Sequence, residues 1–296
     1  MELNRLSLKD SEIFNEFLAI GRHELSVYAF ENIYIWKALF DIRWSVIEKC
    51  LCIFFVDRTG CFLYLPPLSK RNNPGVIQKA FGIMDSFNKN KDISRIENIE
   101  ERELVFYKDS GYSCANKSCD YLCARQALAD LSGNGFKSKR ASFNYFTGHY
   151  TFEYMNFSPR QKKECLKLYS SWAAQRKAGN DDPVYQGMIE DSSKSLKITL
   201  DSYADLNLTG KVVKIDKKIK GFSLGFKLNS DTFCILYEIT DLSIKGLAQF
   251  IFRKFCADLK DFKYINIMDD SGLDNLKEVK LSYRPLKLIP AYIAKR

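Results

Sequence analysis

Residues 212–259 carry the pattern that most limits how this chain can fold. Three apolar runs separated by short polar turns lie at residues 212–215, 219–228 and 233–239. Runs of this length that are bounded by turn residues predict three consecutive antiparallel strands. Directly after them, apolar residues recur every three or four positions across residues 244–259. That spacing predicts an amphipathic helix with one face on the sheet.

The flanking segments extend this pattern in both directions. A strand-like stretch at 152–157 precedes a helix that Ser158 can cap and Pro159 can open, because the missing N–H of proline costs nothing at the first helical position. After a loop that follows Pro183, a second helix is predicted around residues 196–206. Beyond the amphipathic helix, the patterns predict a strand, a short helix and a last strand at 264–268, 273–280 and 286–293.

This order resembles the N-acetyltransferase (GNAT) fold, an α/β (α+β) architecture. A length of 296 residues suits two domains of about 150 residues each. The first half offers a looser version of the same order, with helices at 8–20, 30–40 and from 73 onward, and strands at 44–48, 51–56, 62–65, 93–96 and 121–124. We therefore predict two tandem GNAT-like domains, 1–148 and 149–296. Each would be a mixed, mostly antiparallel sheet flanked by helices, with the working site in the second.

Charge and hydropathy limit the classes of partner. The chain has 45 Lys+Arg against 36 Asp+Glu, a formal charge of +9. This excess favours anionic partners such as nucleotide cofactors, RNA or acidic lipid head groups, without choosing among them. The longest apolar run, residues 50–56, is far shorter than the roughly 20 residues of a transmembrane helix. With no apolar leader at the N-terminus, we expect a cytoplasmic protein, for which peripheral membrane contact stays open.

Cysteine and histidine give little support to metal or nucleophile chemistry. The nine cysteines are odd in number and lack an export signal, which indicates free thiols. Cys114, Cys119 and Cys123 do not have the spacing of a zinc site, so no metal is expected. The two histidines, His23 and His149, lie in no recognisable nucleophile motif, so histidine-based catalysis is not expected.

The loop before the amphipathic helix is a candidate anion site, because a helix N-terminus has unpaired N–H donors and partial positive charge. GNAT enzymes typically carry Gln/Arg-x-x-Gly-x-Gly/Ala there for the coenzyme A pyrophosphate. The present chain keeps Gly246 and Ala248 but has Ser243 at the first position of the motif. Lys245 stands directly before Gly246. These four residues are the predicted cofactor-binding set. The structural alternative is a plain helix start with a small residue for packing.

Residues 266–285 carry a more specific motif. They read NIMDDSGLDNLKEVKLSYRP, with an Asn, an acidic pair, a Gly, a Leu, and a final Lys-x-Ser-Tyr-x-Pro. This closely resembles the C-terminal signature of the phosphatidylglycerol lysyltransferase C-terminal domain family (DUF2156), which has many soluble members. Landmarks along nearly the whole chain agree, such as 34–36, 65–68, 128–133 and 237–238. Ile239 and Ala141 depart from the family pattern, and the membrane domain of the full lysyltransferases is absent, so lipid lysylation is not implied.

The resemblance implies transfer of an acyl or aminoacyl group from acyl-CoA or a charged tRNA to an amine or hydroxyl acceptor. Asp270 and Glu238 would act as bases or bind a cationic group, and Tyr283 would act as an acid. Lys280 and Lys277 would stabilise an oxyanion or hold phosphate. Each has a structural alternative, because the two lysines fit a solvated helix face, Asp270 fits a helix cap and Tyr283 fits a core.

A basic run supports a rival from another class. Lys139 and Arg140 are predicted to bind substrate or phosphate, and the aromatic residues around them could stack on bases. The chain would then be a non-catalytic tRNA-binding or regulatory module on a degenerate fold. Aromatics with this spacing also fit the core of a strand. The sequence leaves the acceptor and the oligomeric state open.

Overall fold

The structure is a computed structural model that describes residues 2–296, and these residues form two compact units. Unit 1 runs to Asp120 and includes the C-terminal segment Leu288–Arg296, and unit 2 is Tyr121–Lys287. These bounds differ from the predicted 1–148 and 149–296, because the segment that follows residue 120 packs within unit 2 and the last strand pairs within unit 1.

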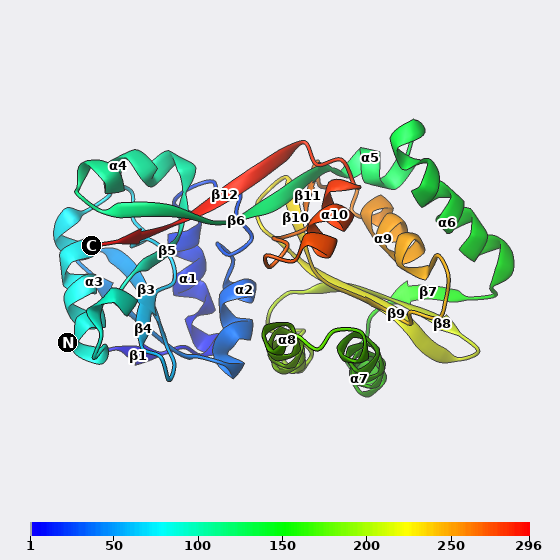
Figure 1. Ribbon diagram of the computed structural model, residues 1–296, viewed down its shortest axis with the longest axis horizontal. Helices are drawn as coiled ribbons and strands as arrows, with labels where there is room; N and C mark the ends of the chain where they lie inside the picture. Colours follow the sequence, from blue (N-terminus) through cyan, green and yellow to red (C-terminus); the bar gives the residue numbers. More distant parts are fainter. Residues whose placement is uncertain (1) are drawn as a thin grey trace. The chain divides into compact units, whose positions relative to one another are not determined.

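Unit 1 is a mixed sheet with helices (Figure 1). Its strand order is β1-β2-β3-β4-β5-β12, antiparallel except for the parallel pair β4 and β5. The strands are β1 (Asn4–Arg5), β2 (Asp41–Ile47), β3 (Cys50–Val56), β4 (Cys61–Leu63), β5 (Ile96–Glu100) and β12 (Lys287–Lys295). The helices are α1 (Ser11–Leu18), α2 (Phe30–Ile35), α3 (Pro74–Phe87) and α4 (Leu104–Asp109).

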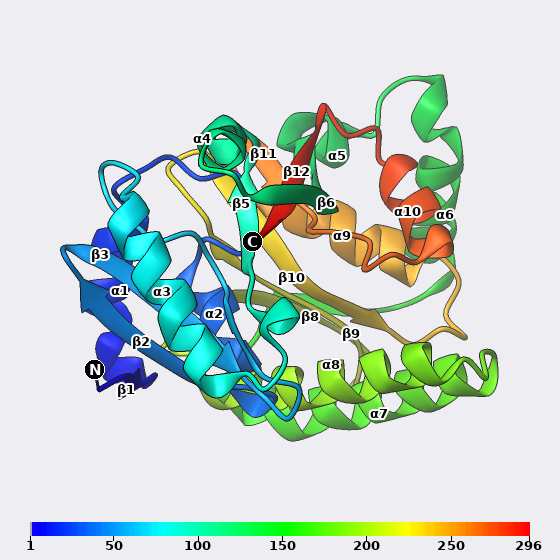
Figure 2. The same cartoon turned by 60° about the vertical axis from the view of Figure 1, so that its left-hand side comes forward.

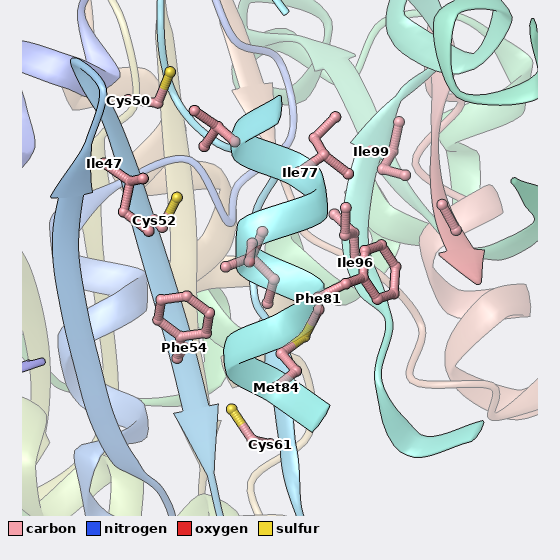
Figure 3. Close-up of a cluster of buried hydrophobic side chains, with 14 of the residues drawn as sticks. Ile47, Cys50, Cys52, Phe54, Cys61, Ile77, Phe81, Met84, Ile96 and Ile99 are labelled. Atoms are coloured by element: carbon pink, nitrogen blue, oxygen red, sulfur yellow. The ribbon is translucent and has the colours of Figure 1, made fainter. Parts of the chain in front are cut away.

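The core of unit 1 forms where α3 packs on the sheet (Figure 3). The predicted start of α3 is confirmed, because the Asn73 side chain accepts hydrogen bonds from the N–H groups of Gly75 and Val76. From there Ile77, Phe81 and Met84 recur on one helix face and meet buried residues of β3, β4 and β5. This three-and-four spacing places an apolar stripe on the sheet.

Unit 2 contains the predicted meander. Its strand order is β6-β11-β10-β9-β8-β7. The pair β10 and β11 is parallel, and the other four pairs are antiparallel. The strands are β6 (Ser113–Ala124), which begins in unit 1, β7 (Glu153–Asn156), β8 (Thr209–Ile215), β9 (Lys218–Lys227), β10 (Thr232–Thr240) and β11 (Tyr264–Asn266). The helices are α5 (Arg125–Asp130), α6 (Lys137–His149), α7 (Lys162–Ala178), α8 (Pro183–Asp201), α9 (Leu247–Asp258) and α10 (Asp274–Leu281).

Helices cover both faces of this sheet, with α7 and α8 side by side on one face and α9 with α6 on the other (Figures 1 and 2). Neighbouring residues of β8 divide between the two layers. Val212 packs with the α7 and α8 residues, and Val213 packs with Phe146 and Phe250 on the other face. Successive side chains of a strand point to opposite faces, so one strand serves both layers.

Two sequence predictions in unit 2 are wrong in ways that have physical causes. The helix predicted at 196–206 is α8, which begins at Pro183, because Asp182 accepts a hydrogen bond from the Val184 N–H at 2.8 Å and proline opens the helix. The aromatics around Lys139, which also fitted a strand, lie on α6 instead. Phe146 is fully buried there against Phe250, so helical spacing serves the core.

The structure gives two further limits within residues 2–296. No helix is both long and apolar enough to cross a membrane. No group of three or more His, Cys, Asp or Glu side chains is placed to hold a metal ion, and Cys114, Cys119 and Cys123 all lie along β6.

Candidate functional site

Glu238 lies at the centre of the candidate site, on β10. The pairing of β10 with β9 shifts register between Ile235 and Tyr237, immediately before this residue. Such a bulge re-aims the side chains that follow it. Burial raises the pKa of Glu238 to about 8, and the positive charges of Lys139 and Lys280 only partly oppose this rise. Glu238 is therefore a carboxyl group that exchanges its proton near neutral pH.

Lys139 approaches the site from α6. Its Nζ lies 4.1 Å from the centroid of the Tyr283 ring, a cation–π contact. Burial lowers the pKa of Lys139, and the charge of Glu238 opposes that change. No ammonium group lies within 4 Å of the Glu238 carboxylate in the described part of the chain. The charges of Lys139 and Lys280 therefore act on Glu238 at longer range.

Tyr283 follows α10 and forms the apolar side of the site. Its side chain is buried, and its ring packs on Phe252 of α9 with centroids 4.5 Å apart. Burial, followed by the charges of Glu238 and Cys256, raises the pKa of Tyr283 well above its ordinary value. The phenol therefore keeps its proton across the working pH range, which makes it a hydrogen-bond donor.

Lys280 reaches the site from α10, and its ammonium group is anchored to the backbone. Its Nζ donates hydrogen bonds to the carbonyls of Ile267 and Asp269 and lies 5.9 Å from the centroid of the Tyr121 ring. These bonds fix α10 to the loop that follows β11. The positive charge still lowers the pKa of Glu238, so Lys280 is both a structural anchor and an electrostatic neighbour.

Asp270 sits in that loop with both carboxylate oxygens engaged. Oδ2 accepts a hydrogen bond from the Tyr121 hydroxyl, and Oδ1 accepts one from the Gly272 N–H at 3.0 Å. Ser271 and Gly272 have φ angles of 54° and 72°, and the Asp270 hydrogen bond helps to hold this left-handed turn. Tyr121 thus links Asp270 to the neighbourhood of Lys280.

The structure therefore brings together four of the predicted residues, Glu238, Lys280, Tyr283 and Lys139. Sequence reasoning placed Lys139 with the phosphate-binding group, about 100 residues before Glu238, and its place beside Tyr283 follows only from the packing of α6. It missed Tyr121 and Cys256, which the sequence presents as ordinary strand and helix core residues.

The other predicted phosphate-binding residues lie elsewhere in unit 2. Lys277 is exposed on α10. The Arg140 guanidinium donates to the carbonyls of Leu131 and Gly133, the latter at 2.6 Å, and so holds the turn after α5. An arginine that donates to backbone carbonyls in this way fixes the conformation of the backbone, and it has fewer N–H donors left to bind a phosphate.

The predicted cofactor loop has its own internal partners. The Asp241 carboxylate accepts the Ser243 N–H at 3.0 Å and the Ser243 hydroxyl at 2.6 Å, and it pairs with Lys220 at 2.8 Å. Burial raises the pKa of Asp241, but the hydrogen bonds from Lys220 and Ser243 outweigh it, so the group stays ionised. An anionic carboxylate at this place disfavours a pyrophosphate.

Gly246 and its neighbours in this loop face α6. Gly246 has φ 82°, and a Cβ there would lie 2.1 Å from the Ser142 carbonyl oxygen, so only glycine fits. The Nζ of Lys245 lies 4.4 Å from the centroid of the Tyr145 ring, and Ala248 lies in the first turn of α9. The packing alternative for Gly246 therefore has direct structural support.

Comparison with known proteins places these observations in a family. Residues 19–295 match the family model described as phosphatidylglycerol lysyltransferase, C-terminal. No protein of curated function matches the chain by sequence. A conserved protein of unknown function from Bacteroides thetaiotaomicron has a similar structure, with 24% identity, 99% of each chain covered and a TM-score of 0.88.

Two further structures are similar at lower identity. L-PGS from Bacillus licheniformis has 17% identity, with 97% of this chain and 92% of that chain covered and a TM-score of 0.65. A tandem GNAT protein from the clavulanic acid biosynthesis pathway has 8% identity, with 99% and 97% covered and a TM-score of 0.52. These likenesses confirm the predicted GNAT-like α/β fold.

Proposed function

The chain belongs to the phosphatidylglycerol lysyltransferase C-terminal family, and we propose that it transfers an aminoacyl group from the ester of a charged tRNA to an amine or hydroxyl acceptor. The observation that carries this proposal is Glu238, a half-buried residue whose carboxyl pKa desolvation raises to about 8 in the field of two ammonium groups. A general base is most effective when its pKa lies near the working pH.

Each side chain of the site has a role in this reaction. The acceptor attacks the ester carbonyl and gives its proton to Glu238. Lys139 and Lys280 favour the negative charge that develops on the carbonyl oxygen, and Tyr283 is a neutral hydrogen-bond donor beside them. When the bond to the leaving ribose oxygen breaks, that oxygen takes the proton from Glu238. The carboxylate is thereby regenerated, and no proton is gained or lost overall.

The choice of an aminoacyl ester over acyl-CoA rests on the loop before α9. A coenzyme A pyrophosphate needs free N–H donors in this loop and at the helix start, whereas the Ser243 N–H is bound by the Asp241 carboxylate and the Leu247 N–H by the Ile244 carbonyl at 3.3 Å. The contact of Gly246 with Ser142 of α6 further limits access to this turn. The cofactor role of Ser243, Lys245, Gly246 and Ala248 is therefore the weaker prediction for this chain.

The rival function, tRNA binding without catalysis, has one favourable observation. Tyr145 and His149 stack with centroids 4.0 Å apart on α6, and Lys245 lies over the Tyr145 ring. Stacked rings beside a cation are a feature of surfaces that bind single-stranded RNA. The buried position of Phe146 and its packing partners removes the other α6 aromatics from such a surface.

The test uses tRNA charged with a labelled mixture of amino acids and three acceptors: phosphatidylglycerol vesicles, a pool of free peptides, and water. We expect label to move from tRNA to one acceptor, and Glu238→Gln to slow this by about 10²- to 10⁴-fold, the usual contribution of a general base. Glu278→Gln, a matched change at an exposed position of α10, is the control and should keep the wild-type rate.

Two results would count against the proposal. Release of free coenzyme A from acetyl-CoA or longer acyl-CoAs, with no loss of label from tRNA, would replace the donor. Salt-sensitive association with tRNA, with no product from any donor, would establish the binding module instead.

A further inference from the structure

Unit 1 contains a cavity of about 500 Å³ that takes no part in the proposed transfer reaction. Its walls come from the end of α1, the segment 66–72 after β4, and the turn that precedes α4. Pockets of 300–1,000 Å³ are typical of sites for small organic molecules. The cavity is therefore large enough for a molecule of sugar or nucleoside size.

One side of the cavity carries positive charge. Lys70 and Arg71 are exposed at its edge, and Arg102 lies on another wall. Arg102 is paired with Glu100, whereas within residues 2–296 neither Lys70 nor Arg71 is paired with a carboxylate. Two adjacent cations without a carboxylate partner favour a ligand with a concentrated negative charge, and the arginine fork matches phosphate oxygens.

A second wall is held in place by its own hydrogen bonds. His23 and Tyr28 stack with ring centroids 4.1 Å apart. His23 Nδ1 lies 3.0 Å from Glu100 Oε2, and the Tyr28 hydroxyl donates to the Asn98 carbonyl at 2.8 Å. Together with Pro66 and Pro67 these rings give the cavity a fixed, partly apolar surface. Such a surface suits the organic part of a ligand, which inorganic phosphate lacks.

Glu103 adds a titratable group to the same cavity. Burial and the charge of Glu100 together raise its pKa to about 7, against the opposing charge of Arg102. Tyr28 and Tyr107 also face this carboxyl. Near neutral pH Glu103 is therefore partly protonated, and a protonated carboxyl donates a hydrogen bond to a phosphate oxygen without repelling it.

We propose that the unit 1 cavity binds a phosphomonoester of sugar or nucleoside size, with the phosphate on Lys70 and Arg71 and the organic part against the His23–Tyr28 wall. Every residue of this site lies in unit 1, so the site is independent of the proposed transfer reaction. It concerns a binding site and involves no covalent step.

Calorimetric titration of the full chain tests this with four probes: glucose 6-phosphate, adenosine 5′-monophosphate, inorganic phosphate, and glucuronate as a carboxylate of matched size. We expect at least one ester to bind, and to bind more tightly than phosphate or glucuronate. The double variant Lys70→Glu/Arg71→Glu should weaken binding by about 100-fold, at about tenfold for each lost charged contact. Arg58→Glu, an exposed charge reversal in the turn between β3 and β4, should leave binding unchanged.

The result that overturns the proposal is binding of neither ester. Equal binding of ester and inorganic phosphate, or binding that survives the double charge reversal, would also contradict it. Because Lys70 and Arg71 are exposed, the variant should keep the wild-type melting temperature, which separates loss of the site from loss of the fold.

Discussion

Two glutamates, one in each unit, show how similar surroundings lead to opposite chemistry. Glu97 lies on β5 of unit 1 and Glu238 on β10 of unit 2, and each is near two cationic side chains. Glu97 touches its partners, with Arg95 Nη2 at 2.6 Å and Lys117 Nζ at 2.7 Å. Burial raises the pKa of Glu97, but the charges of Lys117 and Arg95 outweigh it, so the net change is downward.

Glu238 has the opposite balance. Lys139 and Lys280 attract its negative charge only at longer range, since Lys139 packs on Tyr283 and Lys280 donates to backbone carbonyls. Burial then dominates and raises the pKa to about 8. The comparison indicates that direct contact, rather than the number of nearby cations, decides whether a buried carboxyl holds the fold together or stays ready to exchange a proton.

The largest expected difference between the two glutamates is in stability. Glu97→Ala leaves Arg95 and Lys117 without their buried partner and should lower the free energy of unfolding by about 3 kcal/mol, the low end for a broken buried pair because both cations are partly exposed. Glu238→Gln should not destabilise the fold at pH 8. Urea denaturation of both variants measures this, and equal losses would break the comparison.

The next effect compares two glycines with similar backbone angles. Gly246 and Gly111 have φ angles of 82° and 85°, but a Cβ at Gly246 would meet the Ser142 oxygen at 2.1 Å, and nothing lies within 4 Å at Gly111. Gly111→Ala should cost about 1 kcal/mol from backbone strain alone. Gly246→Ala should cost about 2 kcal/mol more, because α6 must move. Similar melting curves for the two variants would show that the close approach of α6 to Gly246 does not add to the cost of the substitution.

A pH dependence distinguishes the two glutamates further. If Glu238 is the base, kcat/KM of transfer should fall about tenfold for each pH unit below about 8 and level off above it. The two glutamates also change the stability of the fold in opposite directions as pH rises. Glu97, whose folded pKa is lowered, contributes stability above its unfolded value that is lost as pH falls through the folded pKa. Glu238, whose folded pKa is raised, costs stability as pH rises toward 8. A flat rate profile between pH 6 and 9 would exclude Glu238 as the base.

The smallest expected effect concerns Lys139 and tests how strongly a charge at longer range changes the pKa of Glu238. Its positive charge lowers the pKa of Glu238, so Lys139→Met should move the midpoint of the rate profile to higher pH. Lys137→Met, on an exposed part of the same helix, should leave the midpoint in place. An unchanged midpoint in the Lys139 variant would show that Lys280 alone sets the field at Glu238.

Local signals in the sequence were sufficient for most of the sheet and its central helices. The meander and α9 are confirmed, because apolar spacing of two and of three or four residues reports directly on strands and helices. The start of α8 was missed although Asp182 and Pro183 are a helix-opening pair, because residues 190–195 (EDSSKS) are all polar and interrupt the apolar spacing of the helix. The boundary between the two units at residue 120 could not be predicted from local sequence patterns either, because it depends on how distant segments pack.

The site was predictable as a set of residues but not as an arrangement. Glu238, Lys280 and Tyr283 were found through family resemblance, and their proximity depends on how the segment of α10 and Tyr283 packs against α9 and α6. Asp270 and Arg140 hold backbone turns through Gly272 and Leu131. Such roles depend on hydrogen bonds between residues, which residue type alone does not reveal. The catalytic role of Asp270 and the phosphate role of Arg140 stay predictions.

The most direct test of the central claim is a ¹³C NMR titration of the glutamate carboxyl groups, with Glu238→Gln and Glu97→Gln used to assign the two signals. The account predicts that the Glu238 signal titrates near pH 8, while the Glu97 signal titrates below the ordinary value for glutamate. A Glu238 carboxyl that titrates near 4.5, or alongside Glu97, would contradict the claim that burial without direct contact prepares this residue for proton transfer.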